Sequence, residues 1–248
     1  MGDIVKVSWS GGKDSTCAML KHLERGDFVK AVCYAPMFTD TIPLLLKDHY
    51  EFILKTAEKF RQMGATVHIV SGETYFDFVQ RRSTRGKFKG RMFGFPPFQR
   101  GWCNFKRDSK IKALRNLDLG YFDYEDIGIA VDETDRHNQL KGQKHSILCE
   151  ENITEAQAKA IVSEHDMLSP IYCVQNRDGC TLCPNAKKAE RERWFSDYPE
   201  AFPLVLQLQE IVKRERPEQT PLREHRWFVE SEPGTPLTRS EWLDSLLE

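Results

Sequence analysis

Apolar residues in the first 70 positions follow two spacings. Short runs that are mostly apolar, or that alternate apolar and polar residues, predict strands at residues 4–9, 28–34 and 65–70. Residues 16–23 and 45–63 repeat apolar positions at helical spacing. Strands and helices in alternation are typical of βαβ units around a parallel sheet. We therefore expect an α/β fold with a doubly wound, mostly parallel sheet.

Three more elements of this kind follow a long interruption. Residues 127–133 predict a fourth core strand that ends in two carboxylates, and residues 145–148 predict a short fifth strand. Thr154 and Gln157 form a capping box for a helix that runs to about His165. In parallel sheets, ligands bind at the carboxyl ends of the strands, so chemistry is expected there.

The last third of the chain is predicted to be largely helical. We expect two polar helices over residues 186–198 and 201–216. An extended tail over residues 217–236 and a last short helix over residues 238–247 follow them. We therefore divide the chain into an α/β part over residues 1–170, with a basic insertion at about 81–116, and a second part over residues 171–248.

Composition adds little to the predicted fold, but it indicates the cellular compartment of the protein. The chain has 248 residues, a net charge of −1 and seven cysteines. It lacks any apolar run of about 18 residues, which argues against a membrane partner. The first strand begins at once, so we expect no signal peptide, and an odd number of cysteines suits reduced thiols or metal ligands. The expected location is cytoplasmic.

A glycine loop at residues 10–15 lies between the first strand and the first helix. Its sequence is Ser-Gly-Gly-Lys-Asp-Ser. Two glycines allow close approach of backbone to a phosphate, and the N–H groups of a helix N-terminus favour an anion. Ser10 and Ser15 add hydroxyls, and Lys13 adds positive charge. The longer P-loop pattern is absent; the alternative is an ordinary glycine turn.

The insertion at residues 81–116 concentrates positive charge. It contains one acidic residue, Asp108, against twelve basic ones: Arg81, Arg82, Arg85, Lys87, Lys89, Arg91, Arg100, Lys106, Arg107, Lys110, Lys112 and Arg115. Aromatic rings are interleaved with these charges. Cations neutralise phosphates and rings stack on bases, which favours a nucleic-acid surface. A lid over ATP explains the same charge equally well.

Two further groups suggest ligands. Asp132 and Glu133 end the predicted fourth strand, where they would hold Mg²⁺ or orient a substrate, or else only cap the next turn. Cys180 and Cys183 have the spacing that chelates one metal ion, with Cys173 seven residues upstream. A redox pair or two ordinary cysteines are the alternatives.

These motifs, taken in order, resemble the phosphoadenosine-phosphosulfate (PAPS) reductase-like branch of the PP-loop ATP pyrophosphatase superfamily. The matching segments are residues 10–15, 100–103, 128–133, 179–184 and 198–200. The chain departs from true PAPS reductases because no cysteine follows Cys183, and Asp108 stands where a lysine is expected. It is therefore closer to the sulfur-transfer members of the superfamily.

The resemblance implies that a substrate oxygen attacks the α-phosphorus of ATP, releasing pyrophosphate and leaving an adenylated intermediate for sulfur transfer. It assigns catalysis to Lys13, Asp14 and Asp132. It assigns binding of ATP and Mg²⁺ to Ser10, Gly11, Gly12, Lys13, Asp14, Ser15, Tyr34, Ala35, Gly128, Asp132 and Glu133. It assigns an iron–sulfur cluster or Zn²⁺ to Cys103, Cys180 and Cys183, with Cys173 as a fourth ligand.

The expected partners are an adenine nucleotide, nucleic acid at the basic insertion and a sulfur-donor protein, and a homodimer is left open. Two other functions compete with the adenylating sulfurtransferase. One is a PAPS reductase-like sulfonucleotide enzyme, and the other is a non-catalytic protein that binds or sequesters nucleotides.

Overall fold

The computed structural model describes most of the chain. The described residues are 2–34, 42–96, 98–99, 102–173, 175, 179–180, 182–183, 186–217, 230–231 and 235–236. Ala35 and the predicted helix at residues 238–247 lie outside them, as does most of the predicted tail.

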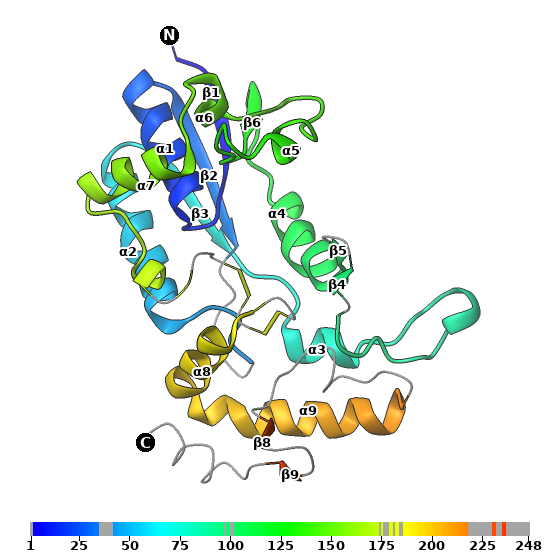
Figure 1. Cartoon of the computed structure of the whole chain (residues 1–248). Helices are drawn as coiled ribbons and strands as arrows, with labels where there is room; N and C mark the ends of the chain where they lie inside the picture. The colour runs from blue at the N-terminus through cyan, green and yellow to red at the C-terminus, as the bar shows by residue number, and fades with distance from the viewer. Residues whose placement is uncertain are drawn as a thin grey trace.

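A five-stranded sheet with all its strands parallel forms the centre of the N-terminal half (Figure 1). Its order is β3-β2-β1-β6-β7. The strands are β1 (Ile4–Trp9), β2 (Phe28–Tyr34), β3 (Thr66–Val70), β6 (Tyr124–Asp126) and β7 (Lys144–His145). Parallel neighbours require crossover connections, and helices supply most of them. The predicted α/β class is confirmed.

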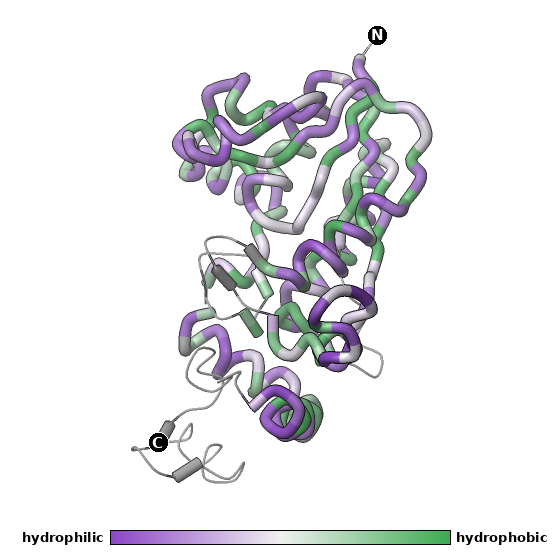
Figure 2. Tube along the Cα trace, turned by 90° about the vertical axis from the view of Figure 1, so that its right-hand side faces the viewer, coloured by the Kyte–Doolittle hydropathy of each residue, from purple (hydrophilic) through white to green (hydrophobic). Residues whose placement is uncertain are grey.

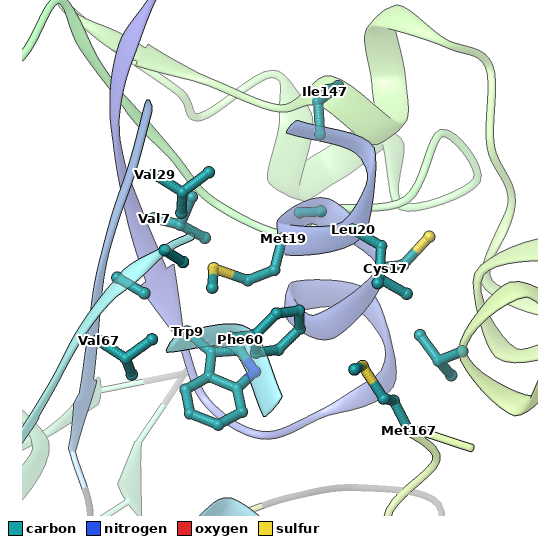
Figure 3. Close-up of a cluster of buried hydrophobic side chains, with 14 of the residues drawn as sticks. Val7, Trp9, Cys17, Met19, Leu20, Val29, Phe60, Val67, Ile147 and Met167 are labelled. Atoms are coloured by element: carbon teal, nitrogen blue, oxygen red, sulfur yellow. The ribbon is translucent and has the colours of Figure 1, made fainter. Parts of the chain in front are cut away.

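The helices that pack near this sheet include α1 (Lys13–Arg25), α2 (Lys47–Gln62), α6 (Ile147–Glu150) and α7 (Glu155–Glu164). The predicted capping box at the start of α7 is present. A first hydrophobic cluster joins strands and helices, with the ring of Trp9 edge-on to that of Phe60 at 5.6 Å (Figure 3). Among the described residues, no helix is long and apolar enough to cross a membrane.

The chain between β3 and β6 leaves the sheet. It contains a hairpin over residues 81–96, which projects to the right in Figure 1, and then a helical rod. Its elements are α3 (Tyr75–Gln80), a 3₁₀ turn η1 (Gly86–Phe88), β4 (Phe98–Gln99), β5 (Trp102–Cys103), a π-helix η2 (Lys106–Ile111) and α4 (Lys112–Asn116). The rod consists of η2 and α4 and returns the chain to the sheet.

A second hydrophobic cluster lies below the sheet in Figure 1, around α8 (Lys188–Asp197) and α9 (Phe202–Glu215). It also takes in residues from 42–46 and from 75–105. Trp194 anchors it, because its indole N–H donates to the Pro43 carbonyl at 2.8 Å. The remaining short elements are α5 (Thr134–His137), η3 (Pro170–Cys173), η4 (Pro199–Ala201), β8 (Glu230–Ser231) and β9 (Thr235–Pro236).

The predicted fourth strand at residues 127–133 is wrong, because the strand ends at Asp126. The segment that follows is held by other groups. The Ile129 carbonyl accepts from the Ser146 hydroxyl at 2.6 Å, and the Val131 N–H donates to the Ile153 carbonyl at 2.9 Å. Ile129 and Ala130 are buried, and beyond the bond from the Ile127 N–H to the His145 carbonyl this segment does not pair as a strand.

The predicted strand at residues 145–148 is wrong beyond its first residue. Strand β7 ends at His145, and Ser146 then caps α6 by accepting from the Cys149 N–H. A serine that offers its hydroxyl to a free N–H starts a helix at this point, and this local bond ends the strand.

Candidate functional site

The glycine loop joins β1 to α1 as the sequence predicts. Gly11 has a φ of +78°, in the left-handed region that favours glycine. A Cβ atom at this position would lie 2.6 Å from Cγ1 of Ile53 and 3.0 Å from Cε1 of His49. Gly12 precedes α1 in an extended conformation, with a φ of −76°. The loop is therefore pressed against α2, and only glycine fits at its first turn.

Hydroxyl groups fix the loop from inside. The Oγ atoms of Ser10 and Ser15 lie 3.0 Å apart, and the Ser10 N–H donates to Ser15 Oγ at 3.1 Å. The Gly12 N–H donates to Ser10 Oγ at 3.2 Å. Because all of these bonds join groups of the loop itself, its own side chains hold the backbone in the curved shape.

The start of α1 is occupied by protein groups. The Lys13 N–H donates to the Tyr172 hydroxyl at 2.8 Å, from a residue 159 positions away. The Lys13 ammonium lies 2.8 Å from Asp14 and 2.6 Å from Glu155. Burial lowers the pKa of Lys13, but the two carboxylates outweigh it and raise that pKa, so the side chain stays charged. Burial raises the pKa of Asp14, and Lys13 opposes this.

A cavity of about 550 Å³ opens beside the loop. Its lining includes Ser10, Gly12, Asp14 and Ser15 from the loop and α1, and Lys106, Lys110 and Arg115 from the rod. The basic residues Lys6, Arg136 and Lys144 also line it, against the carboxylates of Asp14 and Glu125. Positive charge therefore predominates in a cavity that ends at a helix N-terminus, which suits a polyanion.

Gly128 makes the closest approach to the loop. A Cβ atom there would lie 2.5 Å from the Ser15 nitrogen and 2.7 Å from the Asp14 carbonyl carbon. No side chain fits between these two backbone segments. Gly128 also lines the cavity.

Asp132 and Glu133 are engaged elsewhere. Asp132 accepts a hydrogen bond from the Glu155 N–H at 3.0 Å, at the start of α7. Glu133 pairs with Arg136 at 2.5 Å. Neither residue is among those that line the cavity. Tyr34 also lies outside that lining, in the buried end of β2, and burial raises its pKa.

The cysteines fall into distinct surroundings. Burial raises the pKa of the buried Tyr75 hydroxyl, and charges on Cys103, Cys180 and Cys183 raise it further. Cys103 and Cys180 pack against the second hydrophobic cluster, which contains Tyr75. Cys173 is exposed on η3. In the described part of the chain, no three His, Cys, Asp or Glu residues are grouped closely enough to hold a metal ion.

Several residues at this site carried no signal in the sequence. Tyr172 and Glu155 contact Lys13 from distant elements, and neither belongs to a motif. Arg136 and Lys144 follow β6 in isolated positions and still line the cavity. Lys106, Lys110 and Arg115 were recognisable only as members of a basic segment.

Comparison with known proteins found no family model and no curated protein that matches the sequence.

Proposed function

We propose that this protein binds ATP in the 550 Å³ cavity and transfers its AMP group to an acceptor, releasing pyrophosphate. One observation carries the proposal: the glycine loop and the rod, which are distant in sequence, line a single cavity. The loop and the first turn of α1 contribute Ser10, Gly12, Asp14 and Ser15 to the lining, and the rod contributes Lys106, Lys110 and Arg115. The strand order reverses between β1 and β6, beside the loop, which supports the doubly wound class.

In this reaction an acceptor oxygen forms a bond to the α-phosphorus. The bond from that phosphorus to the oxygen that bridges to the β-phosphorus breaks, and pyrophosphate leaves with the electron pair. Negative charge grows on the leaving pyrophosphate. The loop hydroxyls and the cations of the rod stabilise this charge, because they are already in place when the bond breaks.

Mg²⁺ fits this site through Asp14. Magnesium is commonly held by one or two carboxylates together with substrate phosphates, and Asp14 lines the cavity at the loop. Bound Mg²⁺ would neutralise phosphate charge. Asp132 suits this role less well in the arrangement seen, because it does not line the cavity.

Sulfur transfer is the proposed second half of the reaction. A sulfur nucleophile would bond to the activated carbon, and AMP would leave with the electrons of the carbon–oxygen bond. The candidate sulfur carriers or metal ligands are Cys103, Cys180 and Cys183, of which the first two pack against the second hydrophobic cluster. The arrangement seen does not itself form a metal site in the described residues, so no step is assigned to a metal there.

Metal analysis tests the cysteine proposal separately. Protein purified without oxygen should contain iron or zinc in stoichiometric amount, and a Cys180→Ser/Cys183→Ser variant should lose it. A Cys17→Ser variant is the control, because Cys17 is a buried thiol in α1 whose pKa burial raises to about 12. Metal-free wild-type protein that transfers sulfur would exclude this centre. We place the reaction in the cytoplasm, where thiols stay reduced.

Separation of the products of ATP tests the main proposal. Wild-type protein with an acceptor should convert ATP to AMP and pyrophosphate. The Lys110→Ala variant should bind ATP about ten-fold more weakly or worse, as expected when a hydrogen bond to a charged group is lost. Lys112→Ala is the matched control, because Lys112 lies on the same rod but lines a different cavity.

Other product patterns would favour one of the competing functions or contradict the proposal. Formation of ADP and phosphate would contradict attack at the α-phosphorus. Stoichiometric binding of ATP without turnover would favour a nucleotide-sequestering protein, and turnover of a sulfonucleotide in place of ATP would favour a PAPS reductase-like enzyme. Equal ATP affinity in the Lys110 and Lys112 variants would place the nucleotide elsewhere.

A further inference from the structure

The hairpin at residues 81–96 projects from the body of the protein. Its two arms are joined by the Arg82–Met92 bridge and by a hydrogen bond from the Ser83 N–H to the Arg91 carbonyl at 2.9 Å. The turn η1 forms its tip. Figure 1 shows this tip well away from the sheet, and in Figure 2 the hairpin points toward the viewer.

The charge on this hairpin has a single sign. Residues 81–96 contain six basic side chains and no acidic one: Arg81, Arg82, Arg85, Lys87, Lys89 and Arg91. Arg82 pairs with Glu215 of α9. Arg85, Lys87 and Lys89 are exposed, and none has a carboxylate partner among the described residues. These three cations are therefore available to an anionic partner.

An exposed aromatic ring accompanies the cations. Phe88 is 49% exposed, although a phenylalanine is usually buried. Its ring centroid lies 5.0 Å from the Lys87 ammonium and 5.1 Å from the Arg91 guanidinium carbon. An exposed ring with two cations close to it suits a base together with its phosphates.

A cavity of about 340 Å³ continues from this ring toward the base of the hairpin. Its lining combines aromatic and aliphatic residues with two arginines and includes Phe78, Phe88, Met92, Phe93, Arg91 and Arg216. Arg216 is fixed by hydrogen bonds to the Met92 and Phe93 carbonyls at 2.6 and 2.8 Å. A flat, partly polar ring such as an unpaired base suits this lining.

The base of the hairpin is rigid and joined to the nucleotide cavity. The Arg81 guanidinium carbon lies 4.8 Å from the Phe78 ring centroid and 4.3 Å from that of Phe93. Arg81 also pairs with Asp108 at 2.7 Å. Asp108 belongs to η2, which supplies Lys106 and Lys110 to the ATP cavity. The base of the hairpin is therefore joined, through η2, to an element that lines the proposed ATP cavity.

We propose that the hairpin binds single-stranded nucleic acid, which presents the acceptor group to the nucleotide cavity. Arg85, Lys87 and Lys89 contact the phosphates, Phe88 stacks on a base, and the adjoining cavity receives a neighbouring base. A single strand is favoured over a duplex because stacking on Phe88 requires an unpaired base face. The role as acceptor rests on the proposed function, but the binding does not.

Fluorescence anisotropy with a labelled single strand of about 20 nucleotides tests the binding in the absence of ATP. One probe is RNA and a second is DNA of the same sequence, so that the two sources of the strand are distinguished. The Lys87→Ala/Lys89→Ala variant removes two phosphate contacts and should reduce the slope of log affinity against log salt by about 1.4. The same change at Lys55 and Lys159, exposed on α2 and α7, should leave the slope unchanged.

The ring is tested in the same assay. Phe88→Ala should lower affinity by about 5- to 150-fold, the range for loss of one stacked base, and Phe88→Tyr should restore it. Phe28→Ala is the control, because Phe28 is 57% exposed at the start of β2. Binding that is equal in wild type and both hairpin variants would overturn the proposal. Tighter binding of a duplex or of polyglutamate would do so as well.

Pyrophosphate release separates this inference from the proposed function. If the wild-type protein binds single strands through the hairpin but releases no pyrophosphate from ATP, the docking surface stands and the adenylation proposal fails. If it releases pyrophosphate and binds no single strand, the adenylation proposal stands and the docking surface fails.

Discussion

The contact between Gly128 and the glycine loop allows a sharp test of the site. Gly128→Ala adds one Cβ atom, which would lie 2.5 Å from the Ser15 nitrogen and 2.6 Å from its Cα. Ordinary van der Waals contact begins at 3.4 Å, so the start of α1 must move by roughly the difference. Both clashing atoms belong to the backbone, so no side chain can turn aside to make room. Gly128 does not have a positive φ, and the cost is therefore steric alone.

We expect this substitution to cost about 1–3 kcal/mol of folding stability, as overpacking usually does. In a chain of this size that lowers the melting temperature by about 2–12 °C. Binding of ATP should fall more than stability predicts, because the displaced residues are those that would contact the phosphates. Thermal denaturation and calorimetric titration with ATP measure the two effects on the same preparation.

Gly142→Ala is the matched control. Gly142 has a φ of +69°, and a Cβ atom added there would meet nothing within 4 Å, so alanine strains the backbone without touching the loop. It should cost about 1 kcal/mol of stability and leave ATP affinity unchanged. A Gly128→Ala protein with wild-type stability and ATP affinity would refute the close contact. Equal loss of ATP affinity in both variants would show that general destabilisation causes it.

Three further changes test groups that belong to α1 or contact it. Burial lowers the pKa of His22, but Asp126 and then Asp27 outweigh burial and raise that pKa. The network should therefore stabilise the fold fully below about pH 6.5 and lose this stabilisation as the pH rises through the raised pKa. A His22→Gln variant should lack this pH dependence in urea denaturation. Glu155→Gln should release Lys13 and tighten ATP binding up to about five-fold, since a partly exposed ion pair contributes 0.2–1 kcal/mol, and weaker binding by calorimetry would contradict this. Tyr172→Phe should cost about 0.5–1.5 kcal/mol in thermal denaturation, with ATP affinity kept within two-fold because a phosphate oxygen replaces the lost acceptor.

The sequence predicted the elements whose causes are local. Strand β1, the glycine loop and α1 follow one another within 25 residues, and the capping box of α7 is a contact between neighbours. The end of β6 was missed because residues 127–131 are as apolar as a strand. Their backbone bonds to Ser146 and Ile153, which are distant in sequence and leave no local trace.

The basic insertion also shows that a local sequence pattern does not reveal how residues are placed in the fold. Its charge fitted a lid over ATP and a nucleic-acid surface equally well in the sequence. In the structure its basic residues occupy two places: Lys106 and Lys110 line the cavity beside the glycine loop, and Lys87 and Lys89 lie at the tip of the hairpin. Pairing of the hairpin arms and the turn into η2 separate these groups, and neither is encoded by charge alone.

The second hydrophobic cluster imposes an order on folding during synthesis. The first cluster is complete in the chain by Met167, whereas the second joins Phe78 and Phe105 to Leu208 and Val212. A ribosome adds about 5–20 residues per second, so roughly 5–20 s separate the emergence of Phe105 from that of Val212. During this time the apolar side chains of the insertion lack the packing partners that α8 and α9 provide. The dense positive charge around them then acts against aggregation, as charged residues do beside exposed apolar segments.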